Sequence, residues 1–108
     1  MIYEHRVYQP VPGQMPKLLA RFRDHTIPIW KKHGIHPIGF WTTLIGDSSN
    51  ELTYILSWES LADRETRWTA FLSDPAWHKA KDETERDGPI VANIDSKILA
   101  PTDFSALK

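Results

Sequence analysis

The chain has 108 residues, with 13 basic and 14 acidic side chains, a formal net charge of −1 and no cysteine. The length suits one domain of residues 1–108, and the balanced charge lacks the basic surface of a nucleic-acid or membrane-surface binder. The lack of cysteine excludes disulfides, thiolate catalysis and cysteine-based metal sites. No apolar run is long enough for a transmembrane helix, and Glu4, His5 and Arg6 interrupt the apolar run of a signal peptide. We therefore expect a cytoplasmic protein that neither binds nucleic acid nor inserts into a membrane.

Residues 2–9 predict a β-strand, because apolar and polar residues alternate there with a period of two. One face of this strand carries three polar groups, those of Glu4, Arg6 and Tyr8. The opposite face carries a histidine between two other residues, in the order Tyr3, His5 and Val7. Pro10, Pro12 and Gly13 end the strand, since proline cannot donate to a β-ladder and glycine suits a turn.

Residues 14–33 predict an amphipathic helix, because apolar residues recur at helical spacing: Met15, Leu18, Leu19, Phe22, Ile29 and Trp30. Pro16 is tolerated in the first turn, where its missing N–H would have no partner. Pro28 lies inside the helix, so we expect a kink or a break near residues 24–26. Gly34 is the expected C-terminal stop.

Residues 36–46 and 51–58 predict two strands joined by a polar hairpin loop, Gly46-Asp47-Ser48-Ser49-Asn50. Both strands carry apolar residues on both faces, so both faces of the sheet need to be covered. The chain's own helices can cover one face. We expect a second subunit to cover the other, which makes the protein a homodimer or a higher homo-oligomer.

Ser60 followed by Asp63 predicts the N-terminus of a helix, and Asp74-Pro75 predicts a second one. Residues 90–99 predict the last strand. The order β-α-β-β-α-(α)-β favours an α+β, ferredoxin-like sandwich: a four-stranded antiparallel sheet with helices on one face. Residues 100–108 form a tail, in which we expect Phe104 to pack against another element, either of its own chain or of a partner subunit.

Several segments carry a family resemblance: residues 1–8 (MIYEHRVY) before Pro12-Gly13, residues 33–35 (HGI), residues 39–46 (GFWTTLIG), residues 58–64 (WESLADR), residues 96–99 (SKIL) and residues 101–105 (PTDFS). In these segments, which span nearly the whole chain, the sequence resembles the NIPSNAP family. The resemblance implies a ferredoxin-like domain that pairs as a dimeric α+β barrel. It implies no established reaction and no shared catalytic motif.

Glu4, Arg6 and Tyr8 are the first candidate ligand-binding residues, since steps of two residues along a strand space them about 7 Å apart. Together they offer a carboxylate, a bidentate donor and a phenol, which can orient an oxygenated ligand or stabilise an enolate-like anion. The alternative is an ion pair between Glu4 and Arg6 of either subunit that determines the dimer register. Trp41 and Trp58 lie on strands, and each either lines a pocket or is a packing residue.

His5 has three alternatives, a hydrogen-bonded core histidine, a base or a haem ligand. The sequence has no spaced set of metal ligands, no glycine-rich phosphate loop and no serine-containing elbow. We therefore expect neither a metal nor a cofactor.

Three functions fit the sequence. The first is a cofactor-free enzyme, monooxygenase-like or isomerase-like, that acts on a small apolar oxygenated molecule. The second is a non-catalytic module that binds such a molecule. The third is an oligomerisation or assembly module. We expect a pocket between the sheet and the helices or across the dimer, with Arg6 as its main anion-orienting donor.

Overall fold

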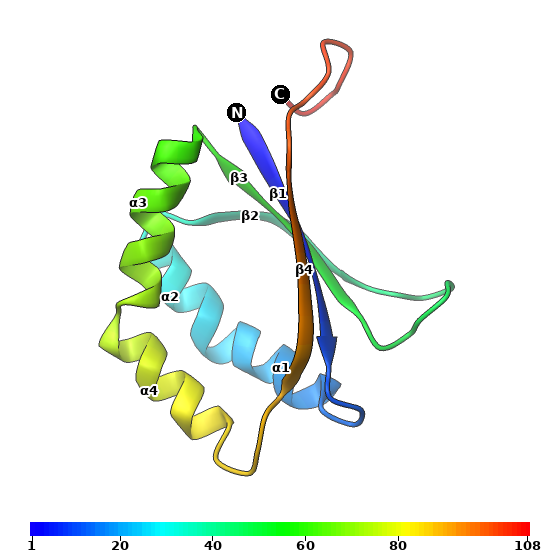
Figure 1. Cartoon of the computed structure of the whole chain (residues 1–108), viewed down its shortest axis with the longest axis vertical. Helices are drawn as coiled ribbons and strands as arrows, with labels where there is room; N and C mark the ends of the chain where they lie inside the picture. Colours follow the sequence, from blue (N-terminus) through cyan, green and yellow to red (C-terminus); the bar gives the residue numbers. More distant parts are fainter.

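Four strands form one antiparallel sheet in the order β2-β3-β1-β4 in the computed structural model, which describes residues 1–108. The elements in chain order are β1 (Ile2–Pro10), α1 (Met15–Arg21), the π-helical segment η1 (Phe22–Thr26), α2 (Ile27–Lys32), β2 (His36–Thr42), β3 (Leu52–Trp58), α3 (Leu61–Leu72), α4 (Pro75–Thr84) and β4 (Val91–Leu99). All helices lie on one side of the sheet (Figure 1). The fold is therefore α+β and ferredoxin-like, as the order of the predicted elements indicated.

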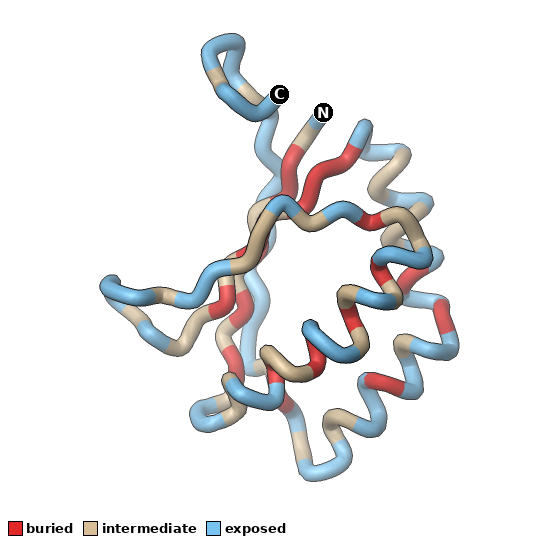
Figure 2. Tube along the Cα trace, turned by 180° about the vertical axis from the view of Figure 1, so that it is seen from behind, coloured by how far each residue is buried: buried red, intermediate tan, exposed pale blue.

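The core lies between the sheet and the helices, where buried residues of both layers face each other (Figure 2). β3 contributes its whole inner face: Leu52, Tyr54, Leu56 and Trp58. The helices contribute Phe22, Trp30 and Phe71, and their rings pack edge-on or tilted against one another and against Tyr54. On β1 the face predicted to carry Glu4, Arg6 and Tyr8 is the inner one.

The helix that contains Pro28 continues past the proline without a break. Pro28 has no N–H, and its ring would crowd the carbonyl of Asp24 in a regular α-helix. The backbone instead widens into η1, in which the N–H of Ile27 donates to the carbonyl of Phe22, five residues back. A π-helical segment has thus formed where the sequence predicted a kink or a break.

The loop between β2 and β3 is longer than the polar segment 46–50 that the sequence predicted. β2 ends at Thr42, which pairs with Leu52 at the start of β3, so Leu44 and Ile45 lie in the loop and are each 94% exposed. The last residue pair between β1 and β3 is Tyr8 with Leu52. Beyond this pair no neighbouring strand continues the ladder. Both apolar side chains of the loop are therefore left uncovered by this chain.

The C-terminal tail also projects from the body of the molecule (Figure 1). Phe104 is 85% exposed, so the expectation that it packs against another element is wrong for the elements of its own chain. No helix combines the length and the apolar character that a bilayer-spanning helix requires.

Gly13 and Gly34 share a left-handed backbone conformation but differ in how closely other atoms surround them. Both have positive φ, +69° and +87°, but an added Cβ at Gly34 would meet the guanidinium of Arg67, while one at Gly13 would meet nothing within 4 Å. Arg67 donates to the carbonyl of His33 at 3.0 Å, which gives this carbonyl at the C-terminal end of α2 a hydrogen-bond partner.

We expect Gly13→Ala to cost about 1 kcal/mol of unfolding free energy, from the left-handed backbone alone. Gly34→Ala should cost about 1 kcal/mol more, because Arg67 must move and its hydrogen bond weakens. Urea unfolding of the two variants measures the difference. Equal losses would show that Arg67 does not stabilise the end of α2.

Candidate functional site

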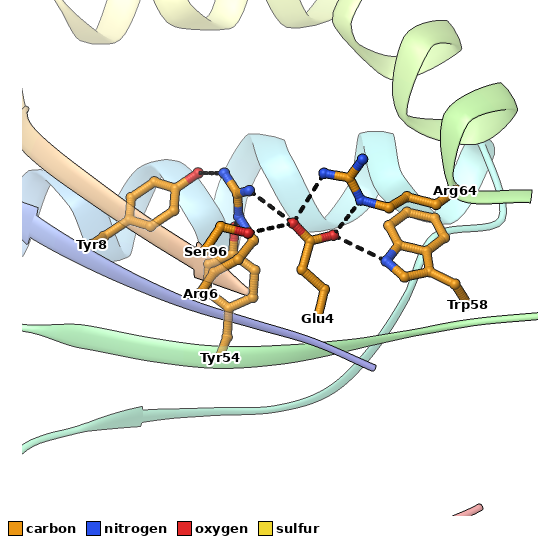
Figure 3. A network of polar contacts seen from close by, with 7 residues as sticks. All are labelled: Glu4, Arg6, Tyr8, Tyr54, Trp58, Arg64 and Ser96. Carbon is orange, nitrogen blue, oxygen red and sulfur yellow. Dashed lines mark hydrogen bonds and ion pairs between the residues drawn. The ribbon is translucent and has the colours of Figure 1, made fainter. Parts of the chain in front are cut away.

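The carboxylate of Glu4 lies in the interior, below α3, at the centre of a hydrogen-bond network (Figure 3). Arg64 of α3 donates twice to it, from Nε at 2.8 Å and from Nη2 at 3.1 Å. Three further donors are Nη1 of Arg6 at 3.1 Å, Nε1 of Trp58 at 3.1 Å and Oγ of Ser96 at 2.7 Å. One buried carboxylate therefore connects β1, β3, β4 and α3.

These donors decide the ionisation of Glu4. Burial by itself raises the pKa of this carboxyl group, but the hydrogen bonds from Arg64 and Ser96 and the charge of Arg6 outweigh it. The pKa falls from 4.5 to about 2. Glu4 is therefore ionised at neutral pH and acts as an acceptor, not as a proton donor.

Arg6 is held on several sides. Its Nε donates to the hydroxyl of Tyr54 at 2.7 Å, and its Nη2 donates to the hydroxyl of Tyr8 at 3.2 Å. The guanidinium also lies over the ring of Trp68, 4.9 Å from the centroid. With the bond to Glu4, three of its five N–H groups are used and two remain. The guanidinium of Arg6 is thus fixed in position, and two of its N–H groups have no acceptor in the protein.

Tyr54 is a structural partner of Arg6 and not an acid–base group. Burial raises the pKa of Tyr54 above its usual value of 10, the nearby Tyr8 adds to the rise, and Arg6 opposes it. The phenol is neutral at physiological pH.

A cavity of about 510 Å³ lies between the sheet and the helices, next to this network. Six aromatic side chains line it: Tyr8, Phe22, Trp30, Trp68, Phe71 and Trp77. Arg6 reaches its wall, as do Arg21 and Glu85, which form an ion pair at 3.2 Å. The wall therefore combines a large aromatic surface with a few charged groups, an arrangement typical of small-molecule pockets.

Four of the five predicted site residues come together. Glu4, Arg6, Tyr8 and Trp58 belong to one network, and Arg6 and Tyr8 also line the cavity. The ion pair between Glu4 and Arg6 is formed within one chain, at 3.1 Å, on the helix side of the sheet. Trp41 lies apart from them. It pairs with Thr53 on the opposite face of the sheet, is 51% exposed and lies over Gly39.

The structure adds residues that the sequence did not single out as site residues: Tyr54, Arg64, Trp68 and Ser96. Tyr54 and Trp68 follow the apolar periodicity of their elements, so each looks like a core residue. Ser96 and Arg64 come near Glu4 only through the strand register and the position of α3. One signal for Arg64 was present, since it precedes Trp68 by four residues and Phe71 by seven and so lies on the apolar face of α3.

His5 lies on the face of the sheet opposite the cavity, paired with Ile55 and Lys97 in the neighbouring strands. It is half-buried there. No group of three or more histidine or carboxylate side chains is arranged to hold a metal ion.

Comparison with known proteins gives a consistent match. The NIPSNAP family model matches residues 3–106. A protein from Agrobacterium tumefaciens, described as a NIPSNAP family protein with unknown function, is 32% identical, with 100% of this chain and 94% of that chain covered and a TM-score of 0.87. A second NIPSNAP family protein from the same organism is 29% identical, with 99% of this chain and 98% of that chain covered and a TM-score of 0.87.

A more distant similarity concerns the fold alone. A candidate antibiotic biosynthesis monooxygenase from Nitrosomonas europaea is 9% identical, with 94% of this chain and 98% of that chain covered and a TM-score of 0.63. No curated protein matches the sequence.

The ionisation of Glu4 predicts a pH-dependent stability. Because the pKa is about 2 when folded against 4.5 as the ordinary value, the stabilisation is complete above about pH 4.5 and is lost as the pH falls towards 2. The difference corresponds to about 3 kcal/mol. Glu4→Gln should lower the unfolding free energy by about 3–5 kcal/mol at pH 7, because two arginines lose their shared carboxylate.

Guanidinium unfolding of wild type and Glu4→Gln at pH 7 and pH 3 measures both effects. The gap between the two proteins should narrow at pH 3. Asp63 and Asp74 also have lowered pKa values, through hydrogen bonds from Arg67 and from Lys32, and they contribute equally to both proteins. Glu65→Gln, at an exposed position of α3, is the control. A constant gap at the two pH values would contradict the role given to Glu4.

Proposed function

This chain belongs to the NIPSNAP family, and we propose that it binds a small, mostly apolar, oxygen-bearing molecule in the cavity between its sheet and its helices. The observation that carries the proposal is the cavity itself. Its volume of about 510 Å³ lies inside the range of roughly 300–1,000 Å³ typical of small-molecule sites. Its aromatic wall favours a flat apolar body.

Arg6 and Tyr8 are the residues we assign to orienting the oxygen of the ligand. Arg6 has two unused N–H groups, and the contacts to Glu4, Tyr54 and Tyr8 hold the guanidinium in place before a ligand arrives. Such a preorganised donor binds with little loss of side-chain entropy. It also stabilises negative charge on a carbonyl oxygen, as an enolate requires.

Catalysis is the extended form of this proposal. An isomerase-like reaction would remove a proton from the carbon next to a carbonyl group and return it elsewhere, with Arg6 opposite the enolate oxygen. Glu85 is the one carboxylate on the cavity wall, but it pairs with Arg21, at the other end of the aromatic wall from Arg6, so it does not lie beside an enolate oxygen held by Arg6. A monooxygenase-like reaction has support only from the similarity of fold described above.

The second part of the proposal is a homodimer formed through the open face of the sheet. Trp41 is 51% exposed and Leu99 is 38% exposed on this face, and Val7 and Ile55 are only half-buried. The loop between β2 and β3 and the C-terminal tail project beyond the sheet and the helices (Figure 2). The face is only partly apolar, because His5, Asp95 and Lys97 lie on it as well. A second copy that covers it would bury the apolar residues and bring the polar ones into contact. An assembly role without a ligand is the alternative, in which only this face has a function.

The ligand proposal is tested with 2-naphthol, a flat apolar molecule with one oxygen, by isothermal titration calorimetry. We expect saturable binding to wild type and a loss of affinity of about tenfold or more in Arg6→Met, since a hydrogen bond to a charged group is worth about 1.5–3 kcal/mol. Tyr8→Phe should give a smaller loss, and Arg23→Met, at an exposed position of η1, should bind as wild type does.

Mass spectrometry of the same samples, and of samples with a ketone probe in deuterated water, separates a catalyst from a binding protein, because oxygenation adds an oxygen atom and proton removal exchanges hydrogen for deuterium. Absence of binding to wild type would refute the ligand proposal.

The dimer proposal is tested by sedimentation equilibrium at micromolar concentration. Wild type should sediment as twice its 12.5 kDa chain mass or a multiple of that dimer. Ile55→Lys places a charge at the centre of the open face, so this variant should become monomeric while keeping its circular dichroism spectrum. Leu61→Lys is the control, because Leu61 is 63% exposed on α3, away from that face. A monomeric wild type would contradict the proposal.

A further inference from the structure

Three buried polar atoms have hydrogen-bonding capacity that the protein does not use: Nε of Arg21, Oγ1 of Thr26 and Nε1 of Trp30. They are the full set of such side-chain atoms in the structure, and all three residues line the cavity. The residues are 4%, 2% and 1% exposed. A buried polar group without a partner destabilises the folded protein, so three of them in residues that line one cavity are unfavourable for a purely structural core.

The π-helical segment η1 brings these residues onto one side of the helix. In a regular α-helix, residues five apart point roughly 140° away from each other. In η1 the hydrogen bonds run from residue i to residue i+5, so Arg21 and Thr26 come close to one line. Trp30 follows four residues later, on the same side. We call Arg21, Thr26 and Trp30 the polar row.

The polar row requires acceptors. The free atoms of Arg21 and Trp30 can only donate, and the hydroxyl of Thr26 can donate or accept. The charged groups on the cavity wall are Arg6, Arg21 and Lys81 against Glu85 alone. A ligand with oxygen acceptors and one negative charge therefore matches the wall better than a neutral or basic one.

The aromatic side chains indicate the shape of the ligand. Arg6 stacks over Trp68 at 4.9 Å and Arg21 stacks over Trp77 at 5.5 Å. Phe71 lies between the two tryptophans, with ring centroids 5.2 and 4.9 Å away. The wall is thus an aromatic strip with an arginine at each end.

The two ends differ in charge environment. Trp30 packs against Trp68 and Tyr54, so it belongs to the Arg6 end, where Arg6 is already paired with Glu4. At the other end, Arg21 and Lys81 have only Glu85 opposite them.

We propose that the ligand is an elongated aromatic carboxylate with a second, neutral oxygen at its far end. Its carboxylate accepts from Arg21 and Thr26, and its neutral oxygen accepts from Arg6, Tyr8 and Trp30. This inference rests on the proposed function, because it names the class of molecule that the same cavity takes. The residues of the polar row are then specificity-determining residues, and the π-helical segment is the backbone feature that aligns them.

Isothermal titration calorimetry with 6-hydroxynaphthalene-2-carboxylate and 2-naphthol tests the inference. Wild type should bind the carboxylate at least about tenfold more tightly than 2-naphthol, which lacks only the carboxylate. Thr26→Val and Arg21→Met should remove most of this preference and leave the affinity for 2-naphthol nearly unchanged. Trp30→Phe should weaken both ligands, and Arg23→Met should change neither.

A second readout separates recognition from packing. Thr26→Val replaces an unpaired buried hydroxyl with a methyl group, so the ligand-free variant should melt at a higher temperature than wild type while losing carboxylate selectivity. If wild type binds both probes equally, or if Thr26→Val keeps the preference, the ligand class is wrong and the proposed function stands. If neither probe binds, both fail.

Discussion

The arrangement of the interior depends on the hydrogen bonds that converge on the buried carboxylate of Glu4. A buried charge of this kind is costly unless every lone pair is used, and here donors from Arg6, Trp58, Arg64 and Ser96 converge on it. Each donor comes from a different position in the fold, so the carboxylate determines how β1, β3, β4 and α3 meet. The same anion makes it possible to keep the guanidinium of Arg6 inside the protein.

The position of Arg6 explains why the interior combines rigidity with spare binding capacity. Contacts to Glu4, Tyr54, Tyr8 and Trp68 leave the side chain one orientation, and two N–H groups remain beside the cavity. A rigid donor near an aromatic wall discriminates between ligands by the placement of their oxygens, not by total apolar area. The opposite face of the sheet, which carries Trp41 and His5, has no comparable network.

Much of the fold could be predicted from the sequence, because alternation along β1 and β3 and the caps at Ser60 and Asp74 are local signals. Local patterns also indicated that Glu4, Arg6 and Tyr8 share a face. They could not show that Ser96 and Arg64 approach Glu4, since cross-strand register and helix position depend on the whole fold. Pro28 signalled a disturbed helix, but whether it becomes a kink or a π-helical turn depends on packing. Apolar residues at 44 and 45 were predicted as strand because composition does not reveal where a neighbouring strand ends.

The connectivity of the Glu4 network has a consequence for the order in which the chain folds. Glu4 bonds to Trp58, Arg64 and Ser96, which follow it by 54, 60 and 92 residues. β1, synthesised first, lies between β3 and β4 and cannot complete its pairing until the last strand exists. Contacts of such high sequence separation slow folding, because loop closure precedes any gain from them. During synthesis one edge of β1 therefore stays unpaired until β4 has been made, and only then can Ser96 complete the hydrogen bonds to Glu4.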